Sequence, residues 1–241
     1  MNVFLDDLRE IFRPGPNAPH GPVAPLLLAM TFVTGLVDAF SFLVLGHVFV
    51  ANMTGNVLFL AFALAGAKGL SVFASLVALV AFVAGAAGGG KIHSLLQNHR
   101  PRLLGASTFV QAILVAVALA LSIVATTPLE GGLRYSIIVA LALGMGVQNA
   151  ASRRLAVPDL TTTVLTLTIT GLGADSRLVG GGGSRATRRS FAIACMLVGA
   201  FVGAIFVLHV TIWWPLAIGL ALIASVAMAA RQLGSAHPEW S

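Results

Sequence analysis

The stretch GLVDAFS at residues 35–41 decides how this chain folds, because it returns as GVQNAAS at residues 146–152. A second element, MTGN at 53–56, returns more weakly as LTLT at 165–168. The two offsets are 111 and 112 residues, close to half of the 241-residue chain. Membrane proteins built from two repeats commonly place their working site where the repeats meet. The sequence therefore predicts two related halves with polar residues at matching positions.

The composition is that of an integral membrane protein of the helical type. Hydrophobic residues make up 58% of the chain and charged residues 9%, whereas an average soluble domain carries about 25% charge. Apolar runs of about 20 residues recur, which is the length of a membrane-spanning helix, and they lack the period-two alternation of barrel strands. The net charge of +6 is explained by cytoplasmic Lys and Arg that fix topology, so we expect the lipid bilayer and no nucleic acid as a partner.

Charge distribution decides how many apolar segments cross the membrane. Eight segments can be drawn, at residues 23–45, 48–66, 70–90, 103–125, 133–152, 160–173, 190–209 and 212–230. If 48–66 and 160–173 do not cross, only Lys68 and Arg134 among the 14 Lys and Arg lie outside. If all eight cross, five basic residues lie outside, so the positive-inside rule favours six spans.

The predicted fold class is an all-α membrane protein with six transmembrane helices and two re-entrant or broken segments. Three crossings per half is an odd number, so the halves are expected to form a two-fold inverted internal repeat. The predicted divisions are a cytoplasmic amino-terminal segment, two membrane repeats and a cytoplasmic tail, at 1–21, 22–130, 131–232 and 233–241. Both termini are expected in the cytoplasm, and the protein in the inner membrane of the cell.

Asp38 is the strongest single candidate for a functional residue. It lies about 15 residues into the first apolar segment, where an ionisable group is costly unless it is paired, hydrated or protonated. One interpretation is a carboxylate that carries a proton or contacts solute, and the other is a hydrogen-bonded carboxyl that joins the repeats. Its counterpart in the second half, Asn149, has the same shape and no charge.

Other polar residues at membrane depth complete the predicted site. Gln148 and Asn149 form an amide pair that offers donors and acceptors. Arg153 is either a topology signal or an anion contact. From the six threonines of 160–173 we select the two that match Thr54 and Asn56. The predicted substrate-binding residues are Asp38, Asn52, Thr54, Asn56, Gln148, Asn149, Arg153, Thr166 and Thr168.

Enzymatic and metal chemistry are not expected. The six histidines have no metal-ligand spacing, and no nucleophile and base are paired in the sequence. We therefore predict no enzyme activity, no metal and no cofactor.

Two pairs of glycines have the small-xxx-small spacing of close helix contacts. They are Gly85 with Gly89, and Gly199 with Gly203, and they are 114 residues apart. Packing is their expected role, and the spacing suits contacts within one chain as well as a homo-oligomer formed through these residues.

The chain resembles the YoaK-like family of bacterial integral membrane proteins, which is classed as a domain of unknown function. The resemblance rests on residues 34–41, 47–49, 52–56 and 146–150, together with Arg153 and Pro158. It implies six spans and brings no established substrate. The leading hypothesis is a transporter of a small polar or anionic solute, with or without proton coupling, whose site lies between inverted repeats. The alternative is a non-transporting membrane scaffold or sensor subunit.

Overall fold

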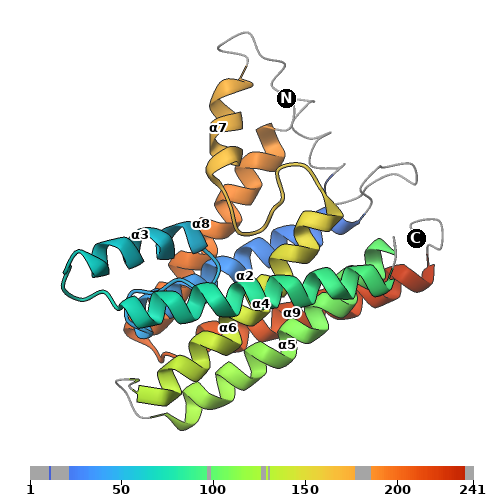
Figure 1. Cartoon of the computed structure of the whole chain (residues 1–241). Coiled ribbons are helices and arrows are strands. Elements are labelled where there is room, and N and C mark those ends of the chain that lie inside the picture. Colours follow the sequence, from blue (N-terminus) through green and yellow to red (C-terminus); the bar gives the residue numbers. More distant parts are fainter. Residues whose placement is uncertain are drawn as a thin grey trace.

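The computed structural model describes residues 11, 22–96, 99–125, 129, 131–176 and 186–236. Within them the chain is helical and has no strand (Figure 1). The helices are α2 (Val23–Val44), α3 (Met53–Leu64), α4 (Val72–Leu96), α5 (Arg100–Val124), α6 (Gly131–Leu155), α7 (Thr166–Ala174), α8 (Ala186–His209) and α9 (Trp214–Ala236). Most of the predicted amino-terminal segment, and residues 237–241 of the predicted tail, lie outside the described residues.

Six of these helices are long and apolar enough to cross a membrane: α2, α4, α5, α6, α8 and α9. The predicted six spans are thereby confirmed as candidate spans. α3 has 12 residues and α7 has 9, so they are about 18 and 14 Å long. Both are too short for a hydrocarbon core of about 30 Å. They occupy the two segments that the charge distribution set apart, and Figure 1 shows each as a short helix at the edge of the bundle.

The helices of the two halves pack against each other in matching pairs. α4 lies along α6, and its counterpart α8 lies along α2. α5 contacts α6 just as α9 contacts α2, and the short helices α3 and α7 pack on α4 and α8 respectively. The first helix of each half is therefore covered by the third helix of the other half.

Glycines bring these crossed helices into backbone contact. A Cβ atom at Gly85 in α4 would collide with the backbone of Leu143, and one at Gly199 in α8 would collide with that of Phe32. Leu143 and Phe32 are 111 residues apart, so the two contacts are equivalent positions of the repeat. Gly89 and Gly203 likewise face α6 and α2. The structure thus places all four glycines in contacts within one chain.

The first helices of the two halves, α2 and α6, form the centre of the bundle. In an apolar 18-residue stretch of α2 and of α6, 61% and 67% of the residues are buried. The corresponding values for the other four candidate spans are 17–33%. Near the start of α6 the Arg134 side chain donates to the Leu45 carbonyl, and near its end Gln148 donates to Thr34. α2 and α6 therefore run antiparallel. The surrounding helices expose apolar side chains, as lipid contact requires, including Val80, Val117 and Phe201.

Replacing Gly85 or Gly199 by alanine is expected to destabilise the protein by about 1–3 kcal/mol, because the new methyl group overpacks a backbone contact. Gly88→Ala in α4 is the matched control, since a Cβ there meets no atom within 4 Å, and it is expected to raise stability by about 0.5–1 kcal/mol. Thermal unfolding of the purified variants in detergent measures both effects. Equal melting temperatures for Gly85→Ala and Gly88→Ala would contradict the packing described.

Candidate functional site

Two non-helical segments enter the bundle, one after each central helix. Residues 45–52 follow α2, and residues 156–165 follow α6. Several non-glycine residues in them have positive φ, namely His47 (58°), Ala156 (48°), Asp159 (65°) and Thr162 (63°). Such backbone is strained, most of all for a β-branched residue, and persists where the surroundings impose it, which is common at ligand sites. The side chains that hold these two segments in place are therefore candidates for a functional site.

Asp38 and Asn56 hold the first segment. Oδ1 of Asp38 accepts hydrogen bonds from the backbone N–H groups of Val50 (3.1 Å) and Ala51 (2.9 Å). The fully buried Asn56 accepts from the N–H of Phe49 at 2.9 Å and donates to its carbonyl at 2.6 Å. Three successive residues of the segment are thus tied to side chains of α2 and α3.

A buried amide network holds the second segment. Nε2 of Gln148 lies 3.0 Å from the hydroxyls of both Thr34 in α2 and Thr162. Oε1 of Gln148 accepts from Nε2 of Gln111 in α5 at 2.6 Å, and the hydroxyls of Ser152 and Thr162 are 3.1 Å apart. All five side chains are at most 4% exposed. Gln148 therefore connects α2, α5 and the segment that precedes α7.

The two clusters are neighbours, because Thr34 and Asp38 are one turn apart on the same face of α2. We call them together the central polar site, which consists of Thr34, Asp38, Asn56, Gln111, Gln148, Ser152 and Thr162. It contains residues from both halves, four of them on the two central helices and the others on α3, α5 and the second segment.

Buried polar atoms next to this network have no hydrogen-bond partner among the described residues. They include Oε1 of Gln111 and the hydroxyl of Ser107, one turn earlier on α5, and the hydroxyl of Thr163 in the second segment. Leaving a buried polar group unpaired costs about 1–3 kcal/mol. These atoms are therefore free hydrogen-bonding capacity beside the network, of a kind that a polar ligand would use.

An arginine fixes the outer part of the second segment. Nε of Arg189, at the start of α8, is 3.0 Å from Oδ1 of Asp159, and Nη1 is 2.7 Å from Oδ2 of Asp175. The guanidinium also donates to the carbonyl of Gly171 in α7. Arg189 therefore joins the strained residue Asp159 to the end of α7. The matching position of the first half, 114 residues earlier, is Ser75, so the two halves hold their segments differently.

The structure brings together some of the residues predicted from sequence. Asp38, Asn56 and Gln148 belong to the central polar site, and Thr168, the counterpart of Asn56, is buried on α7. Asn149 is partly exposed. The remaining predicted residues are exposed side chains, namely Asn52, Thr54, Arg153 and Thr166.

Three further residues hold the second segment and were not predicted from the sequence. Gln111 carries a detectable signal, because it is an amide in the middle of the apolar run 103–125. Thr162 is one of six neighbouring threonines, and only the structure shows that its hydroxyl bonds to Gln148 and Ser152. Arg189 stands in a basic stretch that topology alone explains.

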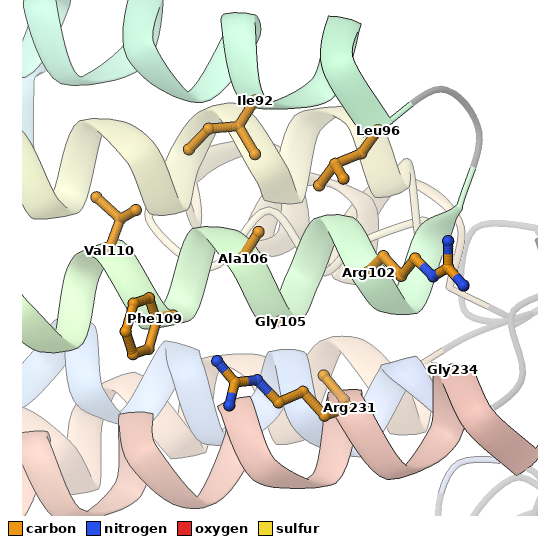
Figure 2. A pocket seen from close by; sticks show the side chains of 10 residues that line it. Ile92, Leu96, Arg102, Gly105, Ala106, Phe109, Val110, Arg231 and Gly234 are labelled. Carbon is orange, nitrogen blue, oxygen red and sulfur yellow. The ribbon is translucent and has the colours of Figure 1, made fainter.

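Two hollows lie away from the central polar site, at the ends of the helices that carry basic residues. One, of about 560 Å³, lies between α4, α5 and α9 (Figure 2). The other, of about 270 Å³, is lined by His93, His99, Arg100 and Arg154 among others. In the described part of the chain no three His, Cys, Asp or Glu side chains are grouped as a metal site would require.

Comparison with known proteins identifies the family. The family described as "Protein of unknown function (DUF1275)" matches residues 26–229. The chain belongs to the DUF1275 family. A protein of similar sequence is the "UPF0700 transmembrane protein YoaK" of Bacillus subtilis (strain 168), 32% identical over 152 residues. These residues cover 62% of this chain and 65% of YoaK, slightly less than two thirds of that relative. No solved structure matches.

The comparison confirms the resemblance seen in the sequence. Together with six apolar helices, it establishes the DUF1275 chain as a multi-pass integral membrane protein. The family description names no activity.

Replacing Asn56 by leucine is expected to destabilise the first segment by about 1–3 kcal/mol, since both backbone groups of Phe49 lose their partner. Asn52→Ala is the matched control, because the exposed Asn52 makes no side-chain capping bond to α3. Hydrogen exchange at the Phe49 amide should become faster in Asn56→Leu and stay unchanged in Asn52→Ala. Unchanged exchange in both variants would show that Asn56 does not hold the segment.

Proposed function

We propose that this DUF1275 protein transports a small polar or anionic solute across the cell membrane through the central polar site. The observation that carries the proposal is the buried network of Gln148, which connects α2, α5 and a strained segment in the middle of the spanning helices. Non-helical backbone at membrane depth is tolerated where protein or a water-filled cavity covers it. Transporters use such broken elements to bind solute at the junction of two repeats.

The proposal includes an inverted repeat in which α3 and α7 are re-entrant. The antiparallel course of α2 and α6 supports it, and so do the equivalent glycine contacts of α4 and α8. Three candidate spans per half give opposite orientations in the membrane. With Lys68 and Arg134 as the outer basic residues, both termini lie in the cytoplasm.

The chemistry of the site favours a small solute that exchanges several hydrogen bonds. Amides at Gln111 and Gln148 and hydroxyls at Ser152 and Thr162 both donate and accept, so they suit carboxylate and neutral polar groups alike. In this conformation the side chains of the network form hydrogen bonds with one another. We propose that solute enters when one strained segment moves, so that the hydrogen bonds of Thr162 are exchanged for bonds to solute.

Asp38 offers a route for proton coupling. As a carboxylate it is a strong acceptor for the backbone of Val50 and Ala51, and charged acceptors make roughly twice as strong a hydrogen bond as neutral ones. Protonation would weaken both bonds and loosen the first segment. A proton on Asp38 would thereby favour movement of α3 next to the solute site.

A second candidate function is a membrane scaffold or sensor subunit that does not transport. The observation in its favour is that Asp38 and Asn56 bond to backbone of their own half. Polar groups used in this way stabilise the fold and require no solute. The experiments below separate the two functions.

Solute-dependent flux is expected when the purified protein in liposomes is offered a panel of inorganic ions, monocarboxylates, dicarboxylates and amino acids. Gln148→Met, which keeps the volume and removes the donors, should lower that flux about tenfold or more, as expected for a lost hydrogen-bonding group. Ser136→Ala is the control, because Ser136 is exposed on the same helix and bonds only to its own turn. No flux for any solute from folded protein would favour the scaffold.

Asp38→Asn is expected to keep the fold, because the amide oxygen still accepts from Val50 and Ala51. Proton movement driven by a transported solute should be abolished, while solute exchange between two loaded compartments continues. A pH-sensitive dye inside the liposomes measures the first and a radiolabelled solute the second. Proton movement at the wild-type rate in Asp38→Asn would exclude this carboxylate as the coupling group.

Cysteine labelling tests the re-entrant topology. In a Cys195→Ser background, a membrane-impermeant maleimide added to intact cells should label Lys68→Cys and not Lys91→Cys. If segment 48–66 crosses the membrane, residue 68 lies inside and residue 91 outside, and the labelling pattern is reversed.

A further inference from the structure

The larger hollow is a groove lined by two arginines and by apolar side chains. It lies between the ends of α4 and α9 and the start of α5 (Figure 2). Arg102 and Arg231 line it together with apolar side chains, which include Ile92, Leu96, Phe109 and Val110. Phe109 and Val110 are about two turns further into the membrane-spanning part of α5 than Arg102. The Arg231 guanidinium reaches toward Phe109, and that of Arg102 lies at the other end of the groove, so basic groups lie along an apolar wall (Figure 2).

The two arginines are held from facing helices. A Cβ at Gly105 of α5 would be 3.7 Å from Cγ of Arg231, and one at Gly234 of α9 would be 3.8 Å from Cγ of Arg102. Each arginine stem thus lies against a glycine of the opposite helix. The guanidinium carbon of Arg231 is 5.2 Å from the ring centroid of Phe109. The packing positions both stems at the groove.

The charge of this pair is not neutralised within the described part of the chain. Its acidic residues are Asp38, Asp159 and Asp175, and none of them forms an ion pair with Arg102 or Arg231. Both arginines are exposed. Arg102 and Arg231 therefore present positive charge to an anion at the groove.

We propose that the groove binds an anionic phospholipid. The phosphate is bound by the exposed side chains of Arg102 and Arg231, whose planar guanidinium groups match phosphate geometry, and an acyl chain lies along Leu96, Phe109 and Val110. Basic pockets between spanning helices on the cytoplasmic side are sites of this kind. The apolar walls select a lipid over free phosphate, because a soluble anion leaves them uncovered. The site is separate from the central polar site and does not depend on transport.

Lipid titration followed by native mass spectrometry and thermal shift tests the proposal on the full-length protein in detergent. Phosphatidylglycerol should bind and stabilise, and phosphatidylcholine should bind at least tenfold more weakly. Arg102→Gln and Arg231→Gln should each weaken phosphatidylglycerol binding about fivefold. Lys91→Gln removes an exposed charge of the same end that does not line the groove, and its affinity should equal that of the wild type.

A second variant tests whether the apolar part of the groove binds the acyl chain, and it does not change the charge of the groove. Ala106→Trp fills the groove from α5 and should abolish phosphatidylglycerol binding, whereas inorganic phosphate should bind weakly and equally to wild type and variant. Equal affinity for the two lipids, or an equal loss in Lys91→Gln, would overturn the proposal. The proposal would also be overturned if inorganic phosphate competed fully with phosphatidylglycerol and Ala106→Trp left phosphatidylglycerol binding unchanged. That result would show an anion site that does not bind a lipid.

Discussion

Backbone contact between crossed helices is the constraint on which the rest of the structure depends. α4 can lie on α6, and α8 on α2, only because Gly85, Gly146, Gly199 and Gly35 have no side chain at the points of contact. Lipid tails are as apolar as the helix surfaces, so the hydrophobic effect contributes little to helix association in a membrane. Close van der Waals packing stabilises the association instead. These two contacts cover α2 and α6, which carry Thr34, Asp38, Gln148 and Ser152 of the central polar site.

The two halves share this framework and differ in the polar chemistry built on it. The first segment is held by hydrogen bonds from Asp38 and Asn56 to its backbone. The second is held by side-chain bonds to Thr162 and by the ion pairs of Arg189. Because the two segments are held by different interactions, conditions that release one segment can leave the other in place.

Much of the fold was predictable from the sequence, because it depends on length, hydropathy and repetition. The apolar runs 23–45 and 133–152 correspond to α2 and α6, and the distribution of basic residues set apart the two segments that contain the short helices α3 and α7. The site was less accessible to prediction. Asp38, Asn56 and Gln148 were found as polar residues at membrane depth. Thr162 was not singled out, because its role depends on a positive φ that a run of threonines does not encode, and Arg189 was hidden among basic neighbours.

The packing of α2 on α8 and of α4 on α6 joins helices from different halves of the chain, and this affects the order in which the protein assembles. The ribosome completes α2 long before α8, so the glycine face of α2 must wait in the membrane without its partner. Asp38 finds Val50 and Ala51 only 12 and 13 residues later in the chain, so its charge is accommodated early in synthesis. Thr34 meets Gln148 after 114 residues, when most of the chain has been inserted. The residues of the polar centre are therefore synthesised before α8, and a nascent chain truncated before Gln148 would hold its first segment without yet containing a site.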